Sequence, residues 1–191
     1  MNTFRTIWGD PGDEKVTGTT QIHQFGTRMR IGQRTYYYGQ ADGAIGAGNI
    51  CQSAVGVANH DMDLVTAAAA VGAKAINVTL GATAASEDDY KDGFLYVNDG
   101  AGEGHTYMIR QHDAIGSAAA GDINLYDGDT VAEAITAASL TGLMRNEYKD
   151  FVVYPTTATG SAVGVCPTEF ADNEFGWLQT WGIAAVLCDV A

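Results

Sequence analysis

DGFLYVNDGAGEGHTYMIR, residues 92–110, contains three alternate glycines that belong either to a phosphate-binding loop or to a turn between two strands. A phosphate loop of the P-loop type needs a lysine after its last glycine and a helix after that. No lysine follows Gly104, and HTYMIR (105–110) alternates as a half-buried strand does. FLYV (94–97) is also typical of a strand. The pattern therefore predicts a β-hairpin whose turn contains the glycines.

Short strands separated by glycine turns occur along much of the chain. In QFGTRMRIGQRTYYYG (24–39), Met29 and Ile31 alternate with Arg28 and Arg30, which places the two arginines on one face of a strand. The Gly-Gln pair that follows predicts a turn, and the Thr-Tyr-Tyr-Tyr run after it predicts a second strand.

Two segments are open to a helical interpretation. For residues 63–85 we expect a strand, a turn at 71–74 and another strand, with one helical turn near Ala67–Ala70 as the alternative because alanine is a good helix former. The segment Thr130–Ser139 is the best candidate for a helix, with Asp129 or Thr130 as its N-cap. These patterns together predict a mainly β fold, a β-barrel or β-sandwich with at most one or two short helices.

The domain organisation is predicted from composition and from one internal echo. Residues 1–22 are polar and glycine-containing without a sustained period, so we expect an extended N-terminal arm before a β-rich domain at 23–191. The segments EDDYKDGFLYV and NEYKDFVVYP share an acidic-Tyr-Lys-Asp lead into an apolar strand. The echo indicates either two related β units, about 23–85 and 86–191, or only similar turn chemistry.

Charge and hydropathy exclude several classes of partner. Ten Lys and Arg against 23 Asp and Glu give a formal net charge of -13, which repels polyanions, so we expect no nucleic-acid partner. We find no apolar run long enough for a membrane helix and no export signal, and we expect no membrane partner. The three cysteines, Cys51, Cys166 and Cys188, lack metal-ligand spacing, and we interpret them as buried thiols.

The sequence contains no recognisable catalytic signature. It has no GxSxG, HExxH or SxxK motif, and its four histidines lie in separate polar contexts. We therefore expect no enzymatic activity, no cofactor and no metal. A small hydrolase with an unrecognised site around His105, His112 and the acidic cluster 87–89 is the weakest alternative.

Six residues are candidates for binding a partner. Three arginines lie within seven residues, at Arg28, Arg30 and Arg34, in an otherwise acidic chain. Trp8 lies in the arm, and Trp177 and Trp181 lie in FGWLQTWGIAAVL, which is too apolar for an isolated exposed edge and predicts either a central strand or a subunit contact.

Four segments carry a resemblance to a known group of proteins. They are WGDPGDEK, GTRMRIGQRTYYYGQADGAIGAGNICQ, DYKDGFLYVNDGAGEGHTYMI and PTTATGSAVGVCPTEFADNEFGWLQTWGIAAVL. Over most of its length the chain resembles virion proteins of tailed bacteriophages, and AIGAGNI, SAVGV and the final strand are similar to those of β-barrel head decoration, or cement, proteins.

The resemblance implies a structural role and no catalytic residues. A decoration protein is made in the host cytoplasm and binds the outer surface of an assembled capsid, with the major capsid protein and copies of itself, as a dimer or trimer, for partners. The acidic composition fits an outer position better than contact with packaged DNA. The alternative from the same virion context is a tail or fibre adhesin that stacks host sugars on Trp8 or on the tyrosines 36–38.

Overall fold

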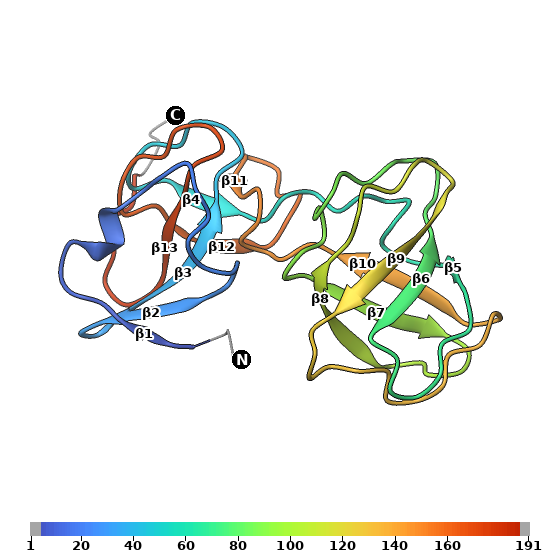
Figure 1. Cartoon of the computed structure of the whole chain (residues 1–191). Helices are drawn as coiled ribbons and strands as arrows, with labels where there is room; N and C mark the ends of the chain where they lie inside the picture. The colour runs from blue at the N-terminus through green and yellow to red at the C-terminus, as the bar shows by residue number, and fades with distance from the viewer. Residues whose placement is uncertain (1–4, 188–191) are drawn as a thin grey trace. The chain divides into compact units, whose positions relative to one another are not determined.

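The computed structural model describes residues 5–187 and divides them into two compact units (Figure 1). Residues 5–55 and 147–187 form unit 1, and Gly56–Asn146 form unit 2, so unit 2 is inserted in the sequence of unit 1. The mainly β prediction is confirmed: the helical part of the described chain is one 3-10 turn, η1, at Asp13–Lys15. No helix among these residues is long and apolar enough to span a membrane.

The units do not follow the division suggested by the echo. A boundary near residue 85 falls inside unit 2, because the sheet of unit 1 combines strands from both ends of the chain. The two Tyr-Lys-Asp segments nevertheless lie one in each unit and form similar turns. Asp92 and Asp150 both have positive φ, at 60° and 55°. Tyr90 and Tyr148, which open these turns, are both buried in their own units.

Unit 1 is an open seven-stranded sheet. Its strand order is β1-β2-β3-β13-β12-β4-β11. The strands are β1 (Ile7–Trp8), β2 (Arg28–Ile31), β3 (Arg34–Gln40), β4 (Ile50–Gln52), β11 (Val152–Val153), β12 (Ala162–Val165) and β13 (Phe175–Trp181). The predicted turn between β2 and β3 is confirmed, and β13 lies centrally between β3 and β12.

The N-terminal segment pairs with this sheet at two places. β1 pairs in parallel with β2, and Gly18 forms an isolated bridge with Phe175 of β13. Residues 5–22 thus bind to the body of unit 1, whereas residues 1–4 of the predicted arm lie outside the described part. Composition predicts an arm separate from the β-rich domain, whereas the observed arm is extended and packs on unit 1. The reason is that Ile7 packs on the apolar face of the sheet.

Unit 2 is a closed six-stranded barrel. Its strand order is β10-β5-β6-β9-β8-β7, and the barrel closes because β7 pairs with β10. The strands are β5 (Leu64–Thr66), β6 (Ala75–Thr79), β7 (Phe94–Asp99), β8 (Thr106–Gln111), β9 (Ala120–Leu125) and β10 (Leu140–Met144). Alternate residues of these strands point inward and form one apolar cluster that includes Ile76, Leu95, Ile109 and Ile123.

The glycine-rich stretch at residues 92–110 is a hairpin, as predicted. β7 and β8 pair antiparallel, with Leu95 opposite Tyr107. Gly100, Gly102 and Gly104 lie in the connecting turn with φ between 82° and 87°, a conformation that side chains other than glycine rarely adopt. The phosphate-loop interpretation is therefore excluded for this stretch.

One predicted element is absent. The helix expected at Thr130–Ser139 does not form, because Ile135 instead makes two backbone hydrogen bonds to Ala69, of 2.9 and 3.0 Å, and its side chain is buried in the barrel. Burial and backbone pairing thus outweigh the helix propensity of the alanines. The strand-turn-strand prediction for residues 63–85 is confirmed by β5 and β6, and the helical alternative at Ala67–Ala70 is wrong.

Candidate functional site: an aromatic and cationic sheet face

Four side chains form one row across the exposed face of unit 1. The strand register pairs Trp8 of β1 with Arg30 of β2, Arg30 with Thr35 of β3, and Thr35 with Trp181 of β13. Trp8 is 74% exposed and Trp181 is 73% exposed. Two tryptophans this exposed on one sheet face are unusual for a surface that contacts only water.

Strand periodicity explains which side chains face outward. In β2 the exposed Arg28 and Arg30 alternate with the buried Met29 and Ile31, as predicted. On the inner face Met29 packs in an apolar cluster with Tyr36, while Ile7 lies against the same cluster. The outer face is therefore free to carry polar and aromatic groups without loss of core packing.

A bulge in β13 brings Trp181 into the row. Trp177 and Trp181 share one parity in the sequence, which predicts that they face the same side. The register between β13 and β3 shifts between Gln179 and Trp181, so Trp181 moves to the exposed face. Trp177 remains in the core, 5% exposed, with its ring 5.1 Å from that of Tyr38. The C-terminal run is thus a central strand that ends in an exposed tryptophan, and Trp177 is not accessible to a partner.

Contacts with neighbouring side chains hold the guanidinium groups of Arg28 and Arg30 in position. The Arg30 guanidinium carbon lies 5.5 Å from the centre of the Trp8 ring, a cation–π arrangement. Arg28 donates hydrogen bonds from Nε and Nη2 to Oγ1 of Thr6, at 3.1 and 2.8 Å. Both arginines remain exposed and keep donors for an anionic group. We call the set Thr6, Trp8, Arg28, Arg30, Thr35 and Trp181 the tryptophan–arginine face.

Arg34 does not belong to this face. Its guanidinium lies 3.4 Å from the carboxylate of the buried Glu14 in η1 and 5.6 Å from the centre of the Tyr36 ring. Burial alone would raise the pKa of Glu14, but backbone N–H groups of Gly12 and Glu14 and the charge of Arg34 lower that pKa below its usual value. Arg34 therefore stabilises an internal turn, and of the six predicted residues the structure brings together Trp8, Arg28, Arg30 and Trp181.

The three consecutive tyrosines do not form the predicted sugar-stacking surface. Tyr36 and Tyr38 are 0% and 2% exposed. Tyr37 stacks on Tyr148, with ring centres 4.9 Å apart and planes within 2°. Of the aromatic residues that the sequence suggests for sugar stacking, Trp8 is the exposed one. Trp181, for which the sequence predicts a core or contact position, is a second exposed aromatic ring.

The histidines do not assemble the hypothetical hydrolase site. His105 and His112 lie at opposite ends of β8, a strand of about 20 Å at this length. Nε2 of the buried His112 accepts the backbone N–H of Tyr90 at 3.0 Å, and its Nδ1–H donates to the Asp113 carbonyl at 2.8 Å. In His60 the Nε2–H donates to the Thr83 carbonyl at 2.8 Å and Nδ1 accepts the Tyr90 hydroxyl. Both ring nitrogens of these two histidines thus serve the fold.

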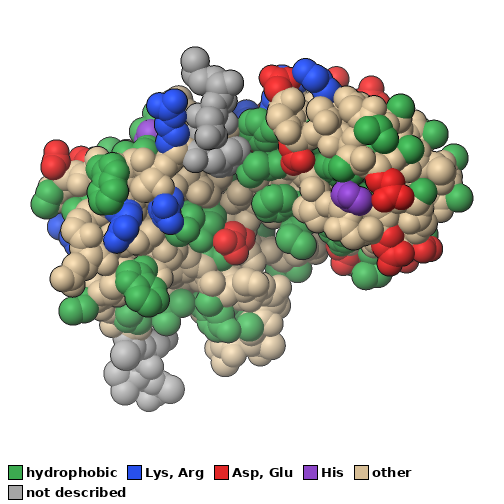
Figure 2. Space-filling model, turned by 90° about the horizontal axis from the view of Figure 1, so that it is seen from below, with side chains coloured by type: hydrophobic (Ala, Val, Ile, Leu, Met, Phe, Trp, Pro, Cys, Tyr) green, Lys and Arg blue, Asp and Glu red, His purple; other side chains and the backbone are tan. Residues whose placement is uncertain are grey.

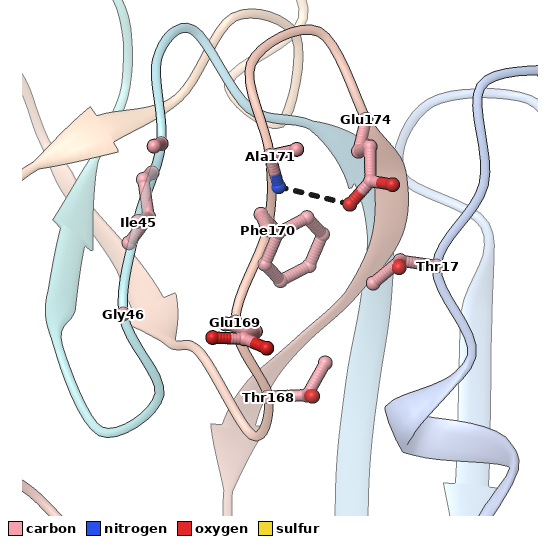
Figure 3. A pocket seen from close by; sticks show the side chains of 9 residues that line it. Thr17, Ile45, Gly46, Thr168, Glu169, Phe170, Ala171 and Glu174 are labelled. Carbon is pink, nitrogen blue, oxygen red and sulfur yellow. Dashed lines mark hydrogen bonds between the residues drawn. The ribbon is translucent and has the colours of Figure 1, made fainter.

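Open hollows lie elsewhere on both units. One, of about 600 Å³, surrounds Phe170 and is bordered by Glu169 and Glu174 (Figure 3). Glu174 accepts the backbone N–H of Ala171 at 2.9 Å, so this carboxylate caps a turn. None of the six predicted partner-binding residues lines this hollow. Within the described part of the chain, no three His, Cys, Asp or Glu side chains gather to hold a metal ion.

Charge is unevenly divided between the units. Gly56–Asn146 contain four of the ten Lys and Arg but 13 of the 23 Asp and Glu. In Figure 2, blue Lys and Arg side chains lie among green hydrophobic ones on unit 1, whereas several groups of red acidic side chains lie on the visible part of unit 2. The tryptophan–arginine face is therefore a cationic patch on an acidic protein, which suits a partner surface of negative charge.

Comparison with protein-family models, curated protein sequences and solved structures finds no match for the chain.

Proposed function

We propose that the chain is a non-enzymatic structural protein of a phage virion that binds the outer surface of the capsid through the tryptophan–arginine face. The partner is the major capsid protein, together with copies of the chain itself in a dimer or trimer. The observation that carries the proposal is the row in which Trp8, Arg30 and Trp181 lie side by side and exposed.

The chemistry of the row supports protein binding. Tryptophan and arginine are enriched among the residues that contribute most to protein interfaces, where their large side chains are dehydrated on contact. Arg28 and Arg30 suit carboxylates on the partner, while Trp8 and Trp181 supply apolar area on either side. An acidic remainder keeps decorated particles from adhering to one another and from binding nucleic acid.

Co-sedimentation with undecorated capsids of the source virus tests the proposal. The wild-type chain is expected to pellet at a fixed, high copy number per particle. Replacing both Trp8 and Trp181 by alanine should weaken binding at least about 30-fold, because each is a candidate hot spot. Arg28→Ala with Arg30→Ala should weaken binding mainly at low salt.

Matched controls separate binding from folding. Tyr154→Ala removes another exposed aromatic of unit 1, and Lys74→Ala with Arg110→Ala removes two cations of unit 2. These variants should bind capsids as the wild type does, and all variants should keep the wild-type far-UV circular dichroism. Capsid binding that is unchanged in the double tryptophan variant would remove the face from the proposal.

A second candidate function rests on the same tryptophans. Exposed Trp8 and Trp181 rings also suit stacking on sugar rings, as in a tail or fibre adhesin that binds host glycan. Copy number distinguishes the two roles, because a decoration protein is present in hundreds of copies per particle and an adhesin in few. Binding to host-cell glycans that is lost in the double tryptophan variant, without capsid binding, would favour the adhesin.

A further inference from the structure

Two buried thiols lie in contact in unit 1. Cys51 of β4 and Cys166, which directly follows β12, are both free cysteines with their sulfur atoms 3.2 Å apart. They are 0% and 1% exposed. Since their positions are separated by 115 residues, the sheet and not the local chain brings them together. The third cysteine, Cys188, lies outside the described residues.

Backbone pairing fixes both cysteines. In the register of β4 and β12, Cys51 lies opposite Gly164, two residues before Cys166. Cys166 donates its backbone N–H to the Asn49 carbonyl at 3.0 Å and accepts the N–H of Gly48 at 2.8 Å. The sulfurs must approach by about 1.2 Å to reach the length of a disulfide bond, a movement within the range of small side-chain rotations.

We propose that Cys51 and Cys166 are a reversible disulfide pair that locks β4 to β12 when the protein meets an oxidising environment. The oxidant is a small disulfide such as oxidised glutathione. One cysteine thiolate attacks it, forming a mixed disulfide and releasing one reduced glutathione. The second thiolate attacks the protein sulfur of that mixed disulfide and releases the other. Two thiols of the protein lose two electrons and two protons, and one glutathione disulfide gains them.

The bond would close a long loop of the chain that contains all of unit 2. All of Gly56–Asn146 lies between the two cysteines in sequence, so the cross-link joins β4, the last strand before unit 2, to β12, the second strand after it. A cross-link over a loop of this length removes much conformational entropy from the unfolded chain. The oxidised protein should therefore resist unfolding more strongly than the reduced one.

Because both thiols are buried, their oxidation depends on opening of the sheet. The hydrogen bond with Cys51, together with burial, raises the pKa of the Cys166 thiol well above its ordinary value. Because the thiolate is the reacting species, this thiol reacts slowly in the closed sheet and faster when β12 opens. Newly made protein in a reducing compartment thus stays reduced, and oxidation follows later.

The test uses the full chain with Cys188→Ser, so that only the buried pair can react. The protein is incubated with oxidised glutathione at mildly alkaline pH. Intact-mass spectrometry should show loss of two hydrogen atoms, and peptide mapping should join Cys51 to Cys166. The melting temperature should rise by about 5–15 °C and return to its starting value on reduction.

Two outcomes would overturn the proposal. One is recovery of both thiols unmodified, or only as separate glutathione adducts, after oxidation at temperatures close to melting. The other is an oxidised form that melts below the reduced protein. The matched variant Cys51→Ala with Cys166→Ala, also carrying Cys188→Ser, should keep its mass and its melting temperature under the same treatment, which shows that the shift needs the pair.

Discussion

The two units of the chain differ in whether their sheets have edge strands. In unit 2 each of the six strands has two hydrogen-bonded neighbours, because the barrel closes where β7 pairs with β10. In unit 1 the sheet is open, with β1 at one end and β11 at the other. A closed barrel offers no strand edge to another chain, whereas an open sheet offers an edge and a flat face.

The exposed tryptophans follow the same division. All three tryptophans of the chain lie in unit 1, and two of them are exposed on its sheet. In the barrel, the buried apolar residues form a single interior cluster. We infer that unit 1 carries recognition and that unit 2 is the more self-contained body. Tryptophan fluorescence reports the unfolding of unit 1 alone, so the stabilities of the two units can be compared.

The largest effect is expected from a cavity in the barrel. Leu95 is fully buried between Tyr107 of β8 and Leu143 of β10. Leu95→Ala should lower the free energy of unfolding of unit 2 by about 3 kcal/mol. Urea denaturation followed by far-UV circular dichroism should show part of the signal lost at lower urea, while tryptophan fluorescence keeps its wild-type midpoint.

The exposed Val65 of β5 provides the control for this variant. Val65→Ala should change the unfolding free energy by no more than about 0.5 kcal/mol. If Leu95→Ala lowers the fluorescence midpoint as well, the two units unfold as one cooperative body and the proposed division of roles loses its basis.

An intermediate effect is expected from Gly39 in unit 1. A Cβ at this position would overlap the backbone carbonyl oxygen of Tyr148 and crowd the Phe151 ring. Gly39→Ala should cost about 2 kcal/mol and lower the fluorescence-detected urea midpoint. Gly18→Ala is the matched control, since nothing lies within 4 Å of its added Cβ. An unchanged midpoint in Gly39→Ala would contradict the close packing of β3 against Tyr148.

The smallest effect is a pH dependence confined to unit 1. Burial lowers the pKa of His23 below its usual value of 6.5, and its ring lies 5.3 Å from that of Trp177. The unfolded chain therefore binds a proton near pH 6.5 that folded unit 1 takes up only at lower pH. Stability of unit 1 should fall as pH drops below about 6.5. Urea midpoints from fluorescence at several pH values measure this, and a profile just as steep in His23→Phe would assign the loss elsewhere.

Local periodicity was sufficient to predict most strands but not how they assemble. Alternation identified β2 and the β7–β8 hairpin, because each has a buried and an exposed face. It failed at Thr130–Ser139, where alanines favour a helix in isolation and pairing with Ala69 decides otherwise. The inserted arrangement of unit 2 depends on pairing between distant strands, which short sequence patterns do not encode.

Only part of the candidate site could be predicted from the sequence, because the site also depends on pairing between strands that are distant in the chain. The sequence names Arg28, Arg30 and Trp8 as candidates, and β pairing places Trp8 beside Arg30, with the guanidinium carbon 5.5 Å from the centre of the Trp8 ring. Parity wrongly put Trp177 and Trp181 on one face, because a single bulge reverses the side of every later residue. The sequence does not distinguish Arg34 from Arg28 and Arg30. The structure does, because Arg34 pairs with the buried Glu14.

The pairing of β4 with β11 has a consequence for how such a chain can change over evolution. Gln52 lies directly opposite Val152, so the chain leaves unit 1 and returns to it on adjacent strands. The ends of unit 2 are joined in a similar way, by a backbone hydrogen bond of 2.7 Å from Leu143 to His60. The barrel is therefore an inserted domain whose two ends lie close together. It can be lost, duplicated or exchanged for another domain by joining β4 to β11 through a short turn, with the strand order of unit 1 unchanged.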